Sequence, residues 1–240
     1  MLRVDSVSVN FGGLRAIDSL ELDIAEAMVT GLIGPNGAGK TTTFNVITGL
    51  QRPTSGRVLF GSKDITQLGP TARARLGLGR TFQRLELFGS LSVVDNVLVA
   101  LESRGAHGRR ARQLADQLLD RLGLSQVAGA QADILPTGTA RLLELARALA
   151  CEPKVLLLDE PSAGLNSTES DRLGGLLSEL ASLGVAVLLV EHDMGLVMRI
   201  CSRIHVLDFG RLIASGSPEQ ISSDPEVQAA YLGTAPMGAA

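Results

Sequence analysis

The chain has 240 residues, of which 45% are hydrophobic and 20% are charged, a composition typical of a globular protein with a sizeable core. The net charge is −3 and the chain has only six Phe, one Tyr and no Trp, which argues against a surface for nucleic acid. No apolar run reaches the roughly 20 residues that span a bilayer, and residues 1–10 alternate like a strand rather than a signal peptide. Any membrane role is therefore expected to come through a partner.

The first elements are expected to form a small antiparallel sheet with one wet face. Residues 2–10 and 19–24 alternate apolar and polar side chains, and a turn with Phe11 and two glycines lies between them. For Phe11 two interpretations stay open at this point. It is either an aromatic of the core or turn, or a flat surface for stacking a ring.

The stretch 34–42 carries the strongest pattern, Gly-x-x-x-x-Gly-Lys-Thr, after an apolar strand at 28–33 and before a helix at 43–50. This pattern in this context predicts a phosphate-binding loop. Glycines let the backbone approach a ligand, and the N–H groups at the start of the helix attract a polyphosphate. Lys40 supplies a positive charge for the β- and γ-phosphates, and the Thr41 hydroxyl is a ligand for Mg²⁺. The predicted nucleotide contacts in this loop are Asn36, Gly37, Ala38, Gly39, Lys40, Thr41 and Thr42.

The middle of the chain is expected to be helical. A strand at 78–82 ends before Gln83, and helices are predicted at 91–101, 111–122 and 140–151. His107 lies in a polar linker and is expected to be exposed. A loop at 135–139 is expected to introduce the last of these helices.

Charged side chains recur on that last helix at a spacing of three residues. Arg141, Glu144 and Arg147 lie opposite its apolar stripe, and the expectation is an exposed ladder that contributes tenths of a kcal/mol.

Two later strands end in polar residues that suggest chemistry. The apolar run 155–158 leads into Asp159 and Glu160, and the run 185–190 leads toward His192. Ligands of open α/β sheets bind at the carboxyl ends of the strands, so these side chains are expected to share one edge. A buried carboxylate pair is costly unless a cation or proton is shared, and a magnesium nucleotide removes that cost.

The remaining signals are structural. Ser167 is expected to cap a helix that reaches residue 183, and residues 208–211 form a predicted hairpin turn. Cys151 and Cys201 lack metal or redox spacing and are expected to be small buried hydrophobes in a reducing compartment. His205 is expected to be an ordinary sheet residue.

Together these motifs resemble the ATP-binding subunits of ABC transporters along almost the whole chain. Gln83 matches the glutamine loop of that family, residues 135–139 match its signature loop, and His192 matches its switch histidine. Phe11 stands where the family has the aromatic that stacks on adenine. The phrases Arg-Thr-Phe-Gln at 80–83 and Ala-Gly-Leu-Asn at 163–166 are similar to the ATPases of branched-chain amino-acid importers.

The resemblance implies an α/β fold with a P-loop NTPase (RecA-like) core, an N-terminal antiparallel β-subdomain and an inserted α-helical subdomain. One ABC ATPase domain would span residues 1–240, with the core at about 1–84 and 152–240 and the helical subdomain at about 85–151. It implies ATP and Mg²⁺ as ligands, and a head-to-tail dimer with a second ATP-binding subunit. It further implies transmembrane permease subunits, a solute-binding protein as an indirect partner, and a peripheral place on the cytoplasmic face of the inner membrane.

The resemblance also implies roles for single residues. Glu160, His192 and Gln83 would be catalytic, and Thr41, Gln83 and Asp159 would hold the metal. ATP would lie between Phe11 and the phosphate loop of one subunit and Gly138 of the other.

The signature loop departs from the family's common Leu-Ser-Gly-Gly-Gln, because Pro136, Thr137 and Thr139 replace the Ser, the first Gly and the Gln. Either Gly138 and the helix N-terminus carry most of the γ-phosphate recognition, or hydrolysis is slow. Two alternatives stay open beside import: an ATPase of lipopolysaccharide export, and a non-transport ABC protein that uses ATP as a conformational clamp.

Overall fold

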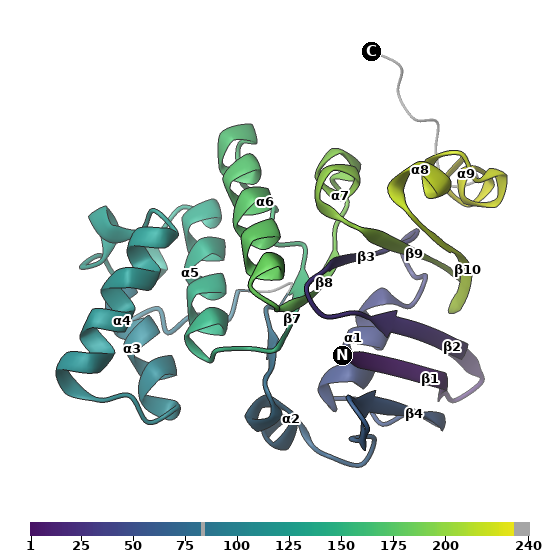
Figure 1. Ribbon diagram of the computed structural model, residues 1–240, viewed down its shortest axis with the longest axis horizontal. Helices are drawn as coiled ribbons and strands as arrows, with labels where there is room; N and C mark the ends of the chain where they lie inside the picture. Colours follow the sequence, from purple (N-terminus) through teal and green to yellow (C-terminus); the bar gives the residue numbers. More distant parts are fainter. Residues whose placement is uncertain (83–84, 233–240) are drawn as a thin grey trace.

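Two β-sheets and the helices around them build the protein, whose computed structural model describes residues 1–82 and 85–232 (Figure 1). The larger sheet has six strands in the order β10-β9-β3-β8-β7-β6. Its strands from β9 to β6 run parallel, and β10 pairs antiparallel with β9 at one edge. The strand bounds are β3 Val29–Ile33, β6 Leu78–Arg80, β7 Val155–Asp159, β8 Ala186–Val190, β9 Arg203–Asp208 and β10 Arg211–Gly216.

The smaller sheet is antiparallel and has the order β2-β1-β4-β5. Its strands are β1 Leu2–Phe11, β2 Leu14–Ile24, β4 Ser55–Phe60 and β5 Lys63–Asp64. The alternating pattern of the first strands therefore forms the predicted sheet, with one face packed on the core.

The hydrophobic core has two parts, one on each face of the larger sheet. Along β7, Leu156 and Leu158 pack toward α5 and α6, whereas Val155 and Leu157 pack toward α1 and the smaller sheet. Each central strand is buried on both faces, which explains why these strands read as continuous apolar runs instead of alternating ones.

Helices lie on both sides of the larger sheet and in a cluster beyond its β6 edge (Figure 1). The described helices and 3₁₀ turns between β6 and β7 lie within residues 93–150, where the composition predicts a helical region. The bounds are α1 Lys40–Thr48, α2 Pro70–Leu76, α3 Val93–Ser103, α4 Gly108–Arg121, η1 Ser125–Val127, η2 Ala132–Ile134, α5 Thr137–Ala150, α6 Ser167–Ser182, α7 Met194–Ile200, α8 Pro218–Ser222 and α9 Pro225–Leu232.

Two predicted helix starts are wrong in detail. The expected loop at 135–139 is shorter, because α5 already begins at Thr137. The cap of α6 is Asn166 and not Ser167: the Asn166 side chain accepts from the backbone N–H of Glu169, and Glu169 returns a bond to the backbone N–H of Asn166. This reciprocal capping box satisfies two donors at once, which a serine one residue later would not do.

The expectation of an exposed charge ladder on α5 is also wrong. Glu144 is 5% exposed, and the side chains of Arg141 and Glu144 form a buried ion pair of 3.2 Å. The reason is tertiary packing. Glu144 and Arg141 bind the backbone of Phe82, which lies against this face of α5.

Within the described ranges, no helix is long and apolar enough to cross a membrane. Cys151 and Cys201 are free thiols, half-buried and buried respectively, and burial raises the pKa of Cys201 to about 12. Both therefore behave as the small hydrophobes that their spacing predicts.

A buried arginine holds the C-terminal end of α1. Arg73 on α2 is 1% exposed, and burial lowers its pKa to about 10. Its guanidinium donates to the carbonyls of Val46 and Ile47 in the last turn of α1, at 2.6 and 2.7 Å. It also donates to the carbonyls of Leu68 and Thr66, at 2.8 and 2.9 Å. The last carbonyls of a helix lack intrahelical donors and carry partial negative charge, so this cation satisfies them.

We expect Arg73→Met to lower the free energy of unfolding by at least about 2 kcal/mol, because it leaves several buried carbonyls without a donor. Equilibrium urea unfolding measures this loss. Arg75→Met on the same helix is the matched control, because Arg75 is exposed, and it is expected to stay within about 0.5 kcal/mol of the wild type. Equal effects of the two substitutions would contradict the assigned role of Arg73.

Candidate functional site

A cavity of about 440 Å³ opens at the carboxyl ends of β3, β7 and β8. The loop between β3 and α1 forms its floor, and the ends of β7 and β8 form one wall. The predicted site residues that line it are Phe11, Asn36, Gly37, Ala38, Gly39, Lys40, Thr41, Thr42, Asp159, Glu160 and His192. Side chains from distant parts of the sequence therefore meet at one edge of the sheet.

Glycine is required at two positions of the loop. A Cβ on Gly34 would lie 2.1 Å from the carbonyl oxygen of Leu207, and a Cβ on Gly39 would lie 2.7 Å from Ile17. Gly39 also has a φ of 105°, in the left-handed region that favours glycine. The loop thus lies against β9 and β2 and leaves the first-turn N–H groups of α1 directed away from the core.

Lys40 is the first residue of α1, and its side chain folds back over the loop. Its ammonium donates to the carbonyl oxygens of Gly34 and Pro35, at 2.6 and 3.0 Å. Burial lowers the pKa of Lys40, and the charges of Glu160 and Asp159 act in the opposite direction. The loop thus holds a cation next to two carboxylates, in the position where phosphate oxygens would compete for its hydrogen bonds.

Asp159 ends β7 and is 3% exposed. Its backbone N–H donates to the hydroxyl of Thr81 at 3.3 Å, and the guanidinium of Arg80 lies 3.6 Å from its Oδ2. Burial raises the pKa of Asp159, and Arg80 opposes that shift. Within residues 1–82 and 85–232, Oδ2 has no hydrogen-bond donor, so this buried acceptor has the Arg80 guanidinium as its ion-pair partner.

Glu160 follows directly, and its Oε1 lies 2.9 Å from Nε2 of His192. Both residues line the same cavity as the phosphate loop. The φ of Glu160 is 51°, which a residue with a side chain adopts at a cost, so the turn after β7 is locally strained.

Sequence reasoning missed Glu191, the residue before His192. Glu191 is 4% exposed, and its carboxylate accepts the backbone N–H groups of Ser162 and His192, at 2.8 and 3.1 Å. It therefore ties the loop after β7 to the end of β8. Its position after an apolar strand was visible in the sequence, but its burial was not.

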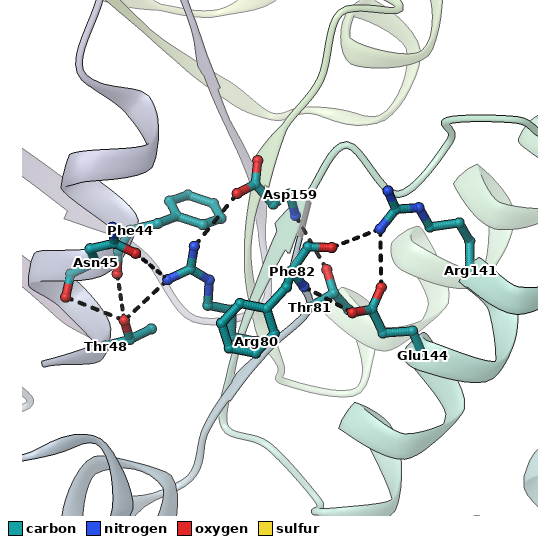
Figure 2. Close-up of polar contacts among 9 residues, drawn as sticks. All are labelled: Phe44, Asn45, Thr48, Arg80, Thr81, Phe82, Arg141, Glu144 and Asp159. Carbon is teal, nitrogen blue, oxygen red and sulfur yellow. Dashed lines mark hydrogen bonds and ion pairs between the residues drawn. The ribbon is translucent and has the colours of Figure 1, made fainter. Parts of the chain in front are cut away.

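Two other missed groups surround the backbone that leads to Gln83, which itself lies outside the described residues. On the side of α5, Glu144 accepts the backbone N–H of Phe82 at 3.1 Å, and Arg141 donates to the carbonyl of Phe82 at 2.7 Å (Figure 2). On the opposite side, Arg80 lies between α1 and Asp159 (Figure 2).

The same face of α5 also holds the chain beyond Gln83. Arg147 donates to the carbonyl of Glu86 and stacks over the ring of Phe88, with 4.6 Å between the guanidinium carbon and the ring centroid. The segments on both sides of Gln83 are therefore attached to α5.

Gly138 lies outside this cavity, in the first turn of α5. A Cβ on it would lie 2.9 Å from the side chain of Leu165 and 3.0 Å from the carbonyl oxygen of Gly164. The expected signature loop therefore packs against the loop that follows the two acids. One chain does not bring Gly138 to its own phosphate loop.

The residues present fit a hard divalent cation. The Thr41 hydroxyl and the Asp159 carboxylate both line the cavity, and oxygen donors of this kind suit Mg²⁺. The described residues contain no cluster of three or more His, Cys, Asp or Glu that would form an all-protein metal cage. That donor set is typical of a magnesium ion that shares its coordination with substrate phosphates.

Comparison with known proteins agrees with this geometry. A model of the ABC transporter family matches residues 17–163. The protein belongs to the ABC transporter family. A second model, described as branched-chain amino acid ATP-binding cassette transporter, matches residues 211–236. The P-loop NTPase fold, nucleotide binding and ATPase activity of this ABC protein follow from that membership.

Curated relatives match this ABC ATPase over nearly its full length. The high-affinity branched-chain amino acid transport ATP-binding protein LivG of Escherichia coli (strain K12) is 41% identical, over 98% of each chain. BraF of Pseudomonas aeruginosa, which has the same description, is also 41% identical over 98% of each chain. The lipopolysaccharide export ATP-binding protein LptB of Acidithiobacillus ferridurans is 36% identical over 97% of each chain.

Solved cassettes superpose closely on this ABC ATPase. One is MJ1267, an ATP-binding cassette of an ABC transporter, with a TM-score of 0.88 and 31% identity over 96% of this chain and 98% of that one. Another is the dimeric post-hydrolysis state of the cassette MJ0796 bound to ADP and phosphate, with a TM-score of 0.84 and 27% identity over 91% and 99%.

Two exposed aromatics line the cavity, and they allow a direct test of the adenine position. Phe11 is 47% exposed and Phe209 is 86% exposed. We expect Phe11→Ala to weaken ATP binding about 10-fold, because base stacking on an aromatic contributes ~1–3 kcal/mol. Fluorescence titration with N-methylanthraniloyl-ATP measures the affinity.

The matched control is Phe209→Ala, which removes a ring from the same rim and is expected to change the affinity less than about 3-fold. The reverse order of effects would assign the adenine to Phe209.

Proposed function

We propose that this ABC ATPase binds and hydrolyses ATP to power the import of branched-chain amino acids, or of similar small polar solutes, through a permease. The observation that carries the solute class is the 41% identity to LivG and BraF over 98% of each chain, together with the family match at residues 211–236. The nucleotide site supports ATP as the energy source, and the similarity to LivG and BraF supports branched-chain amino acids as the transported solutes.

ATP binding is assigned to the phosphate loop and its flank. The first-turn N–H groups of α1 and the Lys40 ammonium would bind the β- and γ-phosphates, and Phe11 would stack on adenine. Lys40 now donates to two loop carbonyls, and its move to phosphate replaces neutral acceptors with charged ones. Asn36, Gly37, Ala38, Gly39, Thr41 and Thr42 complete the cradle.

Thr41 and Asp159 would hold Mg²⁺, with Gln83 as a further ligand, and the bound ion would neutralise charge on the β- and γ-phosphate oxygens. Asp159 suits this role because it lines the cavity and its Oδ2 has no hydrogen-bond donor among the described residues. The protein's own contribution is to hold a hydroxyl on α1 and a carboxylate on β7 at a fixed spacing.

Glu160 would orient and polarise the attacking water as the general base, and His192 would contact the γ-phosphate. The 2.9 Å contact between the two side chains supports this pairing, because it keeps the Glu160 carboxylate at the mouth of the cavity. Gln83 would complete the catalytic group. The proton taken from water would reside on Glu160 before it leaves with the phosphate.

The second half of each ATP site would come from a partner subunit in a head-to-tail dimer. Gly138 lies in the first turn of α5, where backbone N–H groups lack intrahelical acceptors, and it lies outside the cavity of its own chain. Pro136 precedes this turn without a hydroxyl or N–H, so backbone groups would carry most of the γ-phosphate recognition there. The cassette MJ0796, which is dimeric when bound to ADP and phosphate, gives a precedent for dimer formation.

The chain would divide into an α/β core, at about 1–84 and 152–240, and a helical subdomain at about 85–151. The segment around Gln83 and the helical subdomain would contact the permease, at the cytoplasmic face of the inner membrane. A solute-binding protein would take part indirectly. ATP would do work because it binds the closed dimer more tightly than the open one.

The export of lipopolysaccharide is the less favoured alternative, because LptB of Acidithiobacillus ferridurans is 36% identical against 41% for LivG and BraF. A non-transport clamp is disfavoured by the paired Glu160 and His192, since a clamp needs no water-activating group.

We expect Glu160→Gln to lower the ATP turnover at least ~100-fold, which corresponds to roughly 3 kcal/mol of barrier. Glutamine keeps the size of the side chain but cannot accept the proton, so the ATP affinity is expected to stay within about 3-fold. Phosphate release and N-methylanthraniloyl-ATP binding measure the two quantities. Lys40→Ala is the reference for lost binding, and turnover at the wild-type rate in Glu160→Gln would remove Glu160 from the role of base.

The cargo is tested by transport. We expect proteoliposomes that hold the ATPase, its permease and the solute-binding protein to accumulate radiolabelled leucine when ATP is enclosed, and Lys40→Ala to abolish uptake because it removes phosphate binding. The same assay is run with radiolabelled isoleucine and valine. If the proteoliposomes hydrolyse ATP but take up none of the three amino acids, the ATPase assignment stands and the solute class is overturned.

A further inference from the structure

Arg80 occupies a buried position between three parts of the nucleotide site. It is the last residue of β6, and its side chain is 8% exposed. One edge of its guanidinium donates to Asn45 of α1 at 2.7 Å, and the other lies 3.6 Å from the Oδ2 atom of Asp159 (Figure 2). It also contacts the hydroxyl of Thr48 at 3.3 Å.

Two aromatic rings enclose the same guanidinium. Its central carbon lies 5.5 Å from the ring centroid of Phe44 on α1, and 4.8 Å from the ring centroid of Phe82. Phe82 is the last described residue before Gln83. A single side chain therefore contacts α1, the end of β7 and the start of the segment that carries Gln83.

Stability alone does not explain a charged side chain at this point. Burial lowers the pKa of Arg80, and its Nε has no hydrogen-bond partner among the described residues. A buried ion pair contributes little net stability, because the cost of desolvation offsets most of the attraction. An apolar side chain of similar volume would fill the space without that cost.

From these contacts we propose that Arg80 is a positioning residue of the metal site: its guanidinium fork fixes the Asp159 carboxylate relative to α1, which carries Thr41. The inference rests on the proposed role of Asp159 and Thr41 as metal ligands. Arg80 does not touch substrate. It sets the spacing between two ligands that come from different elements of the fold.

The shape of the group matters because the contacts lie on two edges of the guanidinium. A lysine keeps the positive charge, but it supplies a single compact ammonium that cannot span Asn45 and Asp159 together. A positioning role and a purely electrostatic role therefore predict different results for Arg80→Lys, which loses the alignment but keeps the positive charge.

Alignment and charge also act in opposite directions on a divalent cation. Removal of a positive charge next to Asp159 strengthens cation binding by Coulomb's law alone, whereas loss of alignment weakens it. The sign of the change in metal affinity therefore distinguishes a positioning role from mere charge balance.

The experiment measures how tightly the protein, saturated with a non-hydrolysable ATP analogue, binds Mn²⁺ as a spectroscopic substitute for Mg²⁺. The electron paramagnetic resonance signal of free Mn²⁺ gives its dissociation constant. We expect Arg80→Gln and Arg80→Lys each to raise this constant about 10-fold, a change of about 1.4 kcal/mol. Binding of N-methylanthraniloyl-ATP in excess EDTA is expected to stay within about 2-fold, because the phosphate loop is untouched.

Asn45→Ala keeps the test decisive if the Arg80 variants fold poorly. Asn45 is half-buried and is not one of the predicted metal ligands, yet its side-chain oxygen accepts a hydrogen bond from one edge of the fork. We expect Asn45→Ala to raise the Mn²⁺ constant about 3-fold, and Arg80→Gln with Asn45→Ala to match Arg80→Gln alone, because coupled residues are not additive.

Arg75→Gln, on the exposed face of α2, is the matched control and is expected to leave the constant unchanged. Tighter Mn²⁺ binding in Arg80→Gln, wild-type binding in Arg80→Lys, or an additive double variant would overturn the proposal. Asp159→Asn separates the two hypotheses. If it leaves Mn²⁺ affinity unchanged, the proposed metal role of Asp159 fails. If it alone weakens affinity, only the role of Arg80 fails.

Discussion

The parallel register of β3, β8 and β7 is the constraint on which the site depends. Asp159 pairs with Val190 across β7 and β8, and Val29 to Gly31 pair with Val187 to Leu189 across β3 and β8. All three strands end at the same edge, so the phosphate loop after β3, the Glu191–His192 turn after β8 and the acid pair at the end of β7 lie side by side in that order. The apolar core on both faces fixes this register, because a slip by one residue would exchange the side chains that pack on each face.

Like charges lie close together at that edge, and nearby cations offset part of their repulsion. Asp159 and Glu160 are adjacent, and burial together with the charge of Glu160 raises the pKa of Asp159. Two cations, Lys40 and Arg80, lie near these acids. Burial lowers the pKa of each, and the charge of Asp159 opposes both shifts. Negative and positive side chains therefore lie near one another, close to the proposed positions of the phosphates and the metal.

The sequence was sufficient for the parts of the site that depend on local backbone chemistry. The glycine pattern before Lys40, the apolar strand before Asp159 and the turn after Phe11 each have a local signature, and the chain forms the predicted elements. The exposed state of Glu144 was predicted wrongly, because the choice between solvent and the backbone at Phe82 is made by packing between elements 62 residues apart. Glu191 and Arg80 were missed for the same reason.

The contacts around Phe82 connect these observations to the proposed dimer. Core contacts hold Arg80 on one side of the chain that leads to Gln83, and Arg141 and Glu144 of α5 hold Phe82 on the other (Figure 2). Gly138 lies in the first turn of the same helix and packs on the loop that follows Glu160. A helix is stiff along its axis, so a displacement of its first turn would move Arg141 and Glu144, which hold Phe82. In the proposed dimer, a partner that displaces Gly138 would therefore act on both flanks of the proposed metal site, through α5 and through the loop after the acids.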